Sequence, residues 1–352
     1  MMSETMKAAV LHGNEDIRYE DIPKPAAEPG EVLIRVKACG ICGSDIPRVL
    51  HHGAHNYPIV LGHEFSGIVE AVGAGVSHVH IGQRAAGAPL LPCMRCDDCA
   101  RGDYSLCKHY SFIGSRKYGA FAEYVALPEA NAVTFDDSIS FIQGAMFEPS
   151  TVAIHGVKLS GMQGGENVAV LGGGTIGQFT AQWARIFGAR TVTVFDLEDS
   201  RLALAMKLGA DYGINTRTDS YKEDVKALTD GRGFGAVFET AGSPVTMRLA
   251  FELAGNHAPV CFIGTPHTPL TFEPAQWELM NRKEFHLTGS WMSYSAPFPG
   301  KEWELTAHAF AKGTLRFDDE LVSAVMPLSK AAKAFERFKT PGAVQGRIML
   351  EP

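Results

Sequence analysis

The 352-residue sequence has no apolar run near the roughly 18 residues that a membrane-spanning helix needs. Its first ten residues include Glu4 and Lys7 and lack the apolar stretch of a signal peptide. The charge balance is mildly acidic, with 32 Lys and Arg against 39 Asp and Glu. This excludes the basic footprint of a protein that binds nucleic acid or anionic membranes. We therefore expect a cytoplasmic protein with no membrane and no nucleic-acid partner.

Cysteines are few, and their number is odd, at seven. An odd count in a chain without an export signal argues against a disulfide framework. Their spacing is uneven, because six of the seven fall in two groups and one stands alone: Cys39 and Cys42; Cys93, Cys96, Cys99 and Cys107; and Cys261. Clustering of this kind in a reducing compartment indicates metal ligands.

The length predicts two domains, at about 150 residues each. Up to about residue 155, short alternating segments bounded by turns predict strands at Glu31–Lys37, Ser66–Val72 and Ala120–Leu127. This part is expected to be mostly β, a partly open barrel with long loops. No repeats or low-complexity tracts interrupt the chain.

The pattern changes near Gly164, where short apolar strands begin to alternate with helical segments. Strands are expected at Asn167–Leu171, Thr191–Phe195, Gly235–Glu239 and Pro259–Ile263, with helices through Phe187 and at Ser200–Leu208 and Val245–Leu253. This alternation predicts βαβ units and a parallel sheet covered on both faces. From about Ser290, a loop, a helix and a strand Arg347–Leu350 are too short to fold alone, so we expect domains at 1–155, 156–289 and a return at 290–352.

A glycine-rich loop, Gly172–Gly177 (GGGTIG, with Ile176 before the last glycine), follows a predicted strand and opens a helix. Gly172 permits the tight turn, Gly174 lets a pyrophosphate approach the backbone, and Gly177 lets the helix pack on the strand. Asp196, at the end of the next strand, would accept the ribose hydroxyls and favour NAD over NADP, although the nearby Arg201 could accommodate a 2′-phosphate. FAD is the weaker alternative.

Cys93, Cys96, Cys99 and Cys107 place four soft ligands within fifteen residues. This predicts a closed structural zinc site with four thiolates. A ferredoxin-type iron–sulfur cluster also begins with cysteines two residues apart, but the longer last gap and the lack of a second cysteine-rich cluster disfavour it. A disulfide pair is disfavoured by the compartment.

Three separated segments contain a second candidate metal set, Cys42, His63 and Glu148. A catalytic zinc keeps three protein ligands and one open position, where it acts as a Lewis acid on a hydroxyl or carbonyl. Hydride could then pass between the substrate carbon and a nicotinamide. An alternative is a thiol–disulfide site at Cys39 and Cys42, although its setting in a β-rich region is not the usual one.

The order of these motifs resembles that of the zinc-dependent medium-chain dehydrogenases. It runs from GICGSD at residues 40–45 through GHE at 62–64, the four cysteines and EP at 148–149 to the nucleotide loop. The resemblance implies an α/β protein in which a split GroES-like β-barrel catalytic domain surrounds a Rossmann domain with a doubly wound parallel sheet. Glu148 points to the polyol dehydrogenase branch.

Within that branch, the loops at residues 39–48, 53–64, 112–116 and 289–304 resemble those of enzymes acting on a polyol phosphate. The implied reaction is the oxidation of galactitol 1-phosphate by NAD to tagatose 6-phosphate.

The resemblance also implies roles for individual residues. Cys42, His63 and Glu148 would bind the catalytic zinc, with Glu64 as an alternative carboxylate. The four-cysteine set would hold a second, structural zinc. Asp45 would orient the ligand histidine, and Ser44 would take the substrate proton. Many relatives continue the proton path with a histidine three residues after this serine, but Pro47 stands there, so His51, His52 or water would have to substitute.

A substrate phosphate needs further donors, for which Arg48, His51, Arg116 and Lys117 are candidates. The same frame could instead oxidise an unphosphorylated polyol or an amino alcohol, as sorbitol- and threonine-type enzymes do. A non-catalytic nucleotide-binding protein is the alternative from another class. Family resemblance suggests a homodimer or homotetramer.

Overall fold

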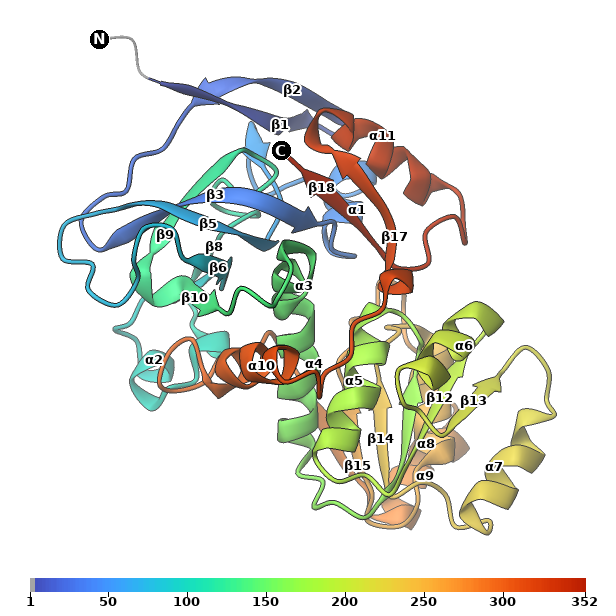
Figure 1. Cartoon of the computed structure of the whole chain (residues 1–352). Coiled ribbons are helices and arrows are strands. Elements are labelled where there is room, and N and C mark those ends of the chain that lie inside the picture. Colours follow the sequence, from blue (N-terminus) through green and yellow to red (C-terminus); the bar gives the residue numbers. More distant parts are fainter. Residues whose placement is uncertain (1–3) are drawn as a thin grey trace. The chain divides into compact units, whose positions relative to one another are not determined.

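The structure, a computed structural model, describes residues 4–352, so the first three residues of the N-terminal stretch considered above lie outside it. The chain divides into two compact units (Figure 1). Of the described residues, the first comprises 4–148, 294–313 and 319–352, and the second comprises 149–293 and 314–318. From the sequence we expected the chain to pass between domains at residues 155 and 289. In the structure the main passages fall at residues 148 and 293. The short return to the second unit at 314–318 had no signal in the sequence. No helix of the described residues is both long and apolar enough to span a membrane.

The first unit is built mainly of strands. They are β1 (Thr5–Gly13), β2 (Asp16–Pro23), β3 (Glu31–Gly40), β4 (Ile59–Val60), β5 (Glu64–Val72), β6 (Arg84–Gly87), β7 (Leu90–Leu91), β8 (Ser111–Phe112), β9 (Tyr124–Pro128), β10 (Ala132–Phe135), β17 (Val322–Pro327) and β18 (Arg347–Glu351). Its helices are α1 (Asp45–Leu50), α2 (Asp97–Arg101), α3 (Phe141–Ala145), α10 (Lys301–Ala311) and α11 (Ala331–Glu336), and α4 (Phe147–Ser160) begins at its boundary.

Strand β3 is the centre of this unit. The main sheet has the order β10-β6-β5-β3-β18-β17, and β9 also pairs with β3. The alternation seen in the sequence puts Val32, Ile34 and Val36 in the core, as expected. In Figure 1 the red strand β18 lies beside the blue strand β3, and Met349 pairs with Gly40. The C-terminal segment therefore returns to the first unit, as predicted.

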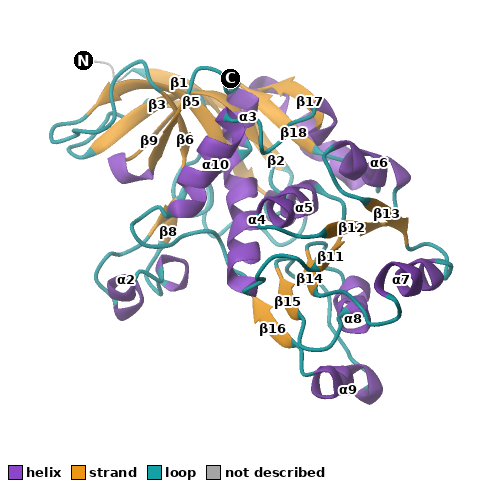
Figure 2. Ribbon diagram, turned by 60° about the horizontal axis from the view of Figure 1, so that its bottom comes forward, coloured by secondary structure: helices purple, strands orange, loops and turns teal. Residues whose placement is uncertain are grey.

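The second unit contains a six-stranded parallel sheet in the order β13-β12-β11-β14-β15-β16. Its strands are β11 (Asn167–Leu171), β12 (Thr191–Asp196), β13 (Tyr212–Asn215), β14 (Ala236–Glu239), β15 (Pro259–Phe262) and β16 (His286–Gly289). Its helices are α5 (Thr175–Ile186), α6 (Asp199–Lys207), α7 (Tyr221–Thr229), α8 (Pro244–Leu253) and α9 (Pro274–Lys283). Figure 2 shows helices on both faces of this sheet, which confirms the expected doubly wound arrangement.

Burial explains which of these elements the sequence predicts. β11 and β14 lie in the middle of the sheet, and residues 168–171 and 236–239 are all buried, so each appears as a continuous apolar run. The sequence analysis missed β13, α7, α9 and β16. α9 has no buried residue and β16 only one that is half-buried, so neither shows the apolar periodicity on which the prediction depends.

Candidate metal centres and dinucleotide site

The four predicted zinc-binding cysteines come together in one lobe around α2. The sulfur of Cys96 lies 3.6 Å from that of Cys99 and 3.8 Å from that of Cys107, and Cys93 lies 4.0 Å from Cys99. Sulfurs bound to a tetrahedral zinc at about 2.3 Å are separated by about 3.8 Å. All four thiols are free of disulfides. The donor set and its spacing therefore fit a structural zinc ion.

A backbone N–H group already stabilises one thiolate of this lobe. Hydrogen bonding, first of all from the Arg95 N–H, lowers the pKa of Cys93 to about 6. Metal binding requires deprotonated thiols, so this shift favours the metal-bound form.

The second metal set forms where β3 and β5 run antiparallel. Gly40, at the end of β3, pairs with Glu64, at the start of β5. Cys42 follows one strand and His63 precedes the other, so the same register brings them together. One ligand atom from each of Cys42, His63 and Glu64 lies within 4.8 Å of the other two.

Three buried polar atoms around this set lack a hydrogen-bond partner among the described residues: Asp45 Oδ1, His63 Nδ1 and Glu64 Oε2. Of these, Glu64 Oε2 is the carboxylate oxygen that belongs to the candidate ligand set, and a divalent cation would compensate its burial. Burial and the charge of Glu64 raise the pKa of the Cys42 thiol well above its ordinary value. A cation would supply the positive charge that a thiolate needs there, so this donor set also fits zinc.

Asp45 lies where a residue that orients His63 should lie. Its Oδ1 is 3.6 Å from His63 Nδ1, which leaves Nε2 as the ring nitrogen for a metal, and its Oδ2 accepts a 3.1 Å hydrogen bond from the Cys42 backbone N–H. Burial raises the pKa of Asp45, while the charges of His63 and Arg48 oppose that shift. The geometry agrees with the orienting role expected from the sequence.

The two candidate glutamates differ from the expectation. Glu64, named only as the alternative, belongs to the group of ligand atoms, and Glu148 does not. Glu64 follows His63 directly on β5, so one hairpin positions both side chains. Glu148 is half-buried near this group, and loss of contact with water raises its pKa to about 7, with Glu64 and Asp45 adding to the effect and His63 and Arg347 opposing it.

Sequence analysis missed Arg347, the first residue of β18. Its Nη2 donates a 2.7 Å hydrogen bond to Glu64 Oε1, and both side chains are buried or nearly so. The one available signal was a basic residue opening an otherwise apolar terminal strand. Arg347 provides the counterion for Glu64 Oε1, while Oε2 has no hydrogen-bond partner among the described residues.

The predicted proton acceptor, Ser44, lies next to the thiol. Its hydroxyl donates to Cys42 Sγ at 3.4 Å and accepts from Arg48 Nη1 at 2.9 Å. His51, whose backbone N–H donates to Pro47 O, and His52 are exposed. Neither histidine ring bonds to Ser44 among the described contacts.

The other phosphate candidates lie on exposed loops. Arg116 lies 4.3 Å from the centre of the Tyr110 ring, and Lys117 is exposed. Sequence analysis missed His55, whose pKa is lowered by burial and by the charges of Arg116 and Arg48. The effect of both guanidinium groups on one imidazole indicates a local concentration of positive charge.

The glycine-rich loop has the geometry that each glycine was expected to provide. Gly172 has φ +102°, and a Cβ at Gly177 would lie 1.7 Å from Gly172 O. Gly174 is the N-cap of α5, and a Cβ there would meet no atom within 4 Å. Half-buried Ile176 lies in the first turn of α5. The loop thus presents an open helix N-terminus that suits a pyrophosphate.

Asp196, at the end of β12, organises this loop. Its Oδ2 accepts from Gly173 N at 2.6 Å, and its Oδ1 accepts from the backbone N–H groups of Leu197 and Glu198. Arg201 Nη1 lies 3.6 Å from Oδ2. A cavity of about 430 Å³ beside them is lined by residues that include Gly172, Asp196, Arg201, Ala241 and Ser243. Its size and lining fit part of a dinucleotide.

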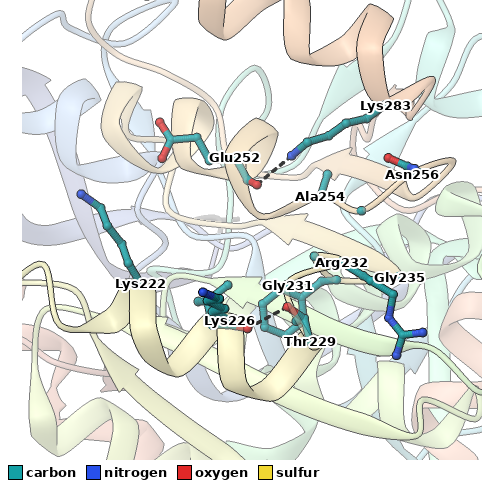
Figure 3. Close-up of a pocket in the computed structure, with 14 residues that line it drawn as sticks. Lys222, Lys226, Thr229, Gly231, Arg232, Gly235, Glu252, Ala254, Asn256 and Lys283 are labelled. Atoms are coloured by element: carbon teal, nitrogen blue, oxygen red, sulfur yellow. Dashed lines mark hydrogen bonds between the residues drawn. The ribbon is translucent and has the colours of Figure 1, made fainter.

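A larger cavity of about 800 Å³ in the second unit has a different explanation. The helices α7, α8 and α9 all end at residues that line it or adjoin its lining, so the negative ends of their dipoles converge there. Figure 3 shows Lys283, whose Nζ donates to Glu252 O at 2.8 Å, together with the basic side chains of Lys222, Lys226 and Arg232. Lys283 offsets the end of α8, while Lys222 and Arg232 pair with Asp219 and Asp230.

The family models match both units. Residues 28–137 match the alcohol dehydrogenase GroES-like domain, and residues 175–308 match the zinc-binding dehydrogenase domain.

Named relatives cover most or all of the chain. It is 39% identical over 354 residues to the galactitol 1-phosphate 5-dehydrogenase of Escherichia coli (strain K12), covering 99% of this chain and 100% of that protein. It is 36% identical over 268 residues to the sorbitol dehydrogenase of Bacillus subtilis (strain 168), covering 75% and 76%.

A solved structure agrees with these likenesses. The crystal structure of galactitol-1-phosphate dehydrogenase from Escherichia coli matches with a TM-score of 0.93 and 38% identity, covering 99% of this chain and 100% of that one. Together with the ligand sets described above, these likenesses show that the chain belongs to the zinc-dependent medium-chain dehydrogenases and is an alcohol or polyol dehydrogenase.

Proposed function

We propose that this enzyme oxidises a polyol phosphate, galactitol 1-phosphate, to tagatose 6-phosphate with NAD. The observation that supports it most is the full-length likeness to the Escherichia coli galactitol 1-phosphate enzyme. The positive charge of Arg116 close to His55 adds support, since a phosphate is best held by such a group.

Cys42, His63 and Glu64 would hold the catalytic zinc, and the four-cysteine lobe would hold the structural one. When bound, zinc supplies a Lewis acid that makes a substrate hydroxyl more acidic, and NAD supplies the hydride acceptor.

The protein's own groups would provide orientation and proton transfer. Asp45 holds the ring of His63, and Arg347 holds the carboxylate of Glu64. Ser44 Oγ would accept the proton of the substrate hydroxyl and release its own hydroxyl proton to water. Asp196 would accept the ribose hydroxyls of NAD and repel a 2′-phosphate, with Arg201 as the residue that could weaken this preference.

A substrate panel tests the proposal. Two charge-assisted hydrogen bonds to a phosphate, at about 1.5 kcal/mol each, correspond to about a 100-fold preference in kcat/KM for galactitol 1-phosphate over galactitol. Sorbitol and threonine should be poorer still, and NADP poorer than NAD. Equal turnover of galactitol and its phosphate would favour an unphosphorylated polyol, the function that the sorbitol dehydrogenase likeness supports.

We also propose that the enzyme is a homodimer or homotetramer. Strand β16 ends the parallel sheet and pairs only with β15 among the described strands. Two large apolar side chains on or just after this strand are exposed, Leu287 by 40% and Trp291 by 49%. Analytical ultracentrifugation should show an oligomer that Leu287→Lys weakens, because a charge on a strand edge opposes pairing. A wild-type monomer would contradict the proposal.

A further inference from the structure

The hydroxyl of Ser44 has an unusual setting at the start of α1. Ser44 is the N-cap, and such a side chain normally accepts a hydrogen bond from the backbone N–H two or three residues on. The third residue is Pro47, which has no N–H. Ser44 has φ −74° and ψ −18° and makes no capping bond through its side chain. Its hydroxyl is therefore not used by the helix.

Arg48 takes up the acceptor site that the helix leaves open. Its Nη1 donates to Ser44 Oγ at 2.9 Å and to Ser44 O at 2.8 Å, and it lies 3.6 Å from Asp45 Oδ1. Only 24% of the Arg48 side chain is exposed. These partners fix the guanidinium against the turn that carries Ser44.

The contacts with Cys42 and Arg48 leave the Ser44 hydroxyl with one hydrogen-bond site for a substrate. A serine hydroxyl has one donor and two acceptor sites. The Ser44 hydroxyl donates its hydrogen to Cys42 Sγ at 3.4 Å, and it accepts a hydrogen bond from Arg48 at one of its two acceptor sites. One acceptor site remains, next to the thiol of the candidate metal set. A substrate hydroxyl that donates to Ser44 can use only that site.

We propose that Arg48 is a positioning residue for the proton-accepting hydroxyl of Ser44 and is not a ligand of the substrate phosphate. A guanidinium has no acceptor site, so Arg48 itself takes no proton. It holds the Ser44 hydroxyl in one orientation, in which the oxygen accepts the substrate proton at its remaining site while the hydroxyl gives its own proton to water. This inference rests on the proposed role of Ser44 and differs from the expectation that placed Arg48 among the candidate phosphate donors.

The test separates binding from turnover in the zinc-loaded enzyme, using Arg48→Met, Arg48→Lys and Arg116→Met. The dissociation constant of galactitol 1-phosphate is measured in the presence of NADH, where no turnover occurs. For Arg48→Met we expect this constant to change less than twofold, while kcat falls about 10- to 100-fold, within the range of proton-transfer contributions. The loss should be equal for galactitol 1-phosphate and galactitol. Arg48→Lys, or guanidinium ion added to Arg48→Met, should restore part of kcat.

A dissociation constant that rises tenfold or more in Arg48→Met, with loss of the preference for the phosphorylated substrate, would overturn the inference. Unchanged kcat would overturn it as well. If Arg48→Met does not retain two zinc ions per chain, the same comparison is made with Arg48→Lys, whose kcat should fall without a change in binding. Failure of the proposed function is a separate result, because the wild-type enzyme would then show no preference for galactitol 1-phosphate. Arg116→Met shows the response expected of a true phosphate donor, namely weaker binding.

Discussion

Replacing Arg347 with Met should destabilise the first unit strongly when zinc is removed. Glu64 is fully buried and Arg347 is 13% exposed, and they are joined by a 2.7 Å charged hydrogen bond. Loss of one partner of a buried pair costs about 3–5 kcal/mol, because the other charge remains without compensation. The upper half of that range is expected here, since Asp45 and Glu148 place further acidic groups nearby. Bound zinc would supply positive charge to the same carboxylate and reduce the loss.

Urea unfolding followed by circular dichroism, with and without a chelator, measures this effect. At a slope of about 3 kcal/mol per molar urea, the chelated variant should lose about 1.3 to 1.7 M in midpoint. Arg18→Met is the matched control, because the pair of Arg18 with Asp16 is exposed on both sides and its loss should leave the midpoint unchanged. A loss below about 1 kcal/mol in chelated Arg347→Met would refute the reasoning that this arginine is the counterion of Glu64.

Three other predictions concern the candidate sites. Glu64→Gln should lower the zinc content measured by elemental analysis from two ions per chain to about one, whereas Glu148→Gln should retain both; the opposite result would restore Glu148 as the ligand. Gly177→Ala should weaken NADH binding, followed by fluorescence, and lower thermal stability, because its Cβ would lie 1.7 Å from a backbone oxygen. Gly174→Ala should weaken NADH binding alone, and equal stability of both variants would contradict the loop geometry. Cys39→Ser should keep dehydrogenase activity, since the one hydrogen bond seen for its buried thiol among the described residues goes to Gly40 O at 3.8 Å, and loss of activity with intact zinc would favour thiol chemistry.

The parts of the fold that the sequence predicts well are those where burial is complete. The expected bounds of β11, Asn167–Leu171, agree with the structure because four of its five residues are fully buried. The strand expected at Ala120–Leu127 starts later, at Tyr124. Ala120 and Phe121 are buried too, but their N–H groups donate to Gly62 O and Leu61 O in an irregular loop. An apolar pattern indicates that a segment is buried, but it does not indicate which carbonyl groups accept hydrogen bonds from the N–H groups of that segment.

The candidate site follows a similar rule. Local motifs predict Cys42, His63 and the four cysteines, because each carries its own chemistry in a short segment. The choice between Glu64 and Glu148 depends on strand register, which pairs Gly40 with Glu64. The partner of Glu64 lies 283 residues further along the chain, so no local pattern could connect the two.

That sequence separation has a consequence for biosynthesis. At 5–20 residues per second, the ribosome adds Arg347 about 15 to 60 s after Glu64. Throughout this interval a nascent chain that had already closed its barrel would hold an acidic group without its natural neutralising partner. The barrel is therefore expected to remain open during translation, or to recruit a metal ion before the final strand emerges.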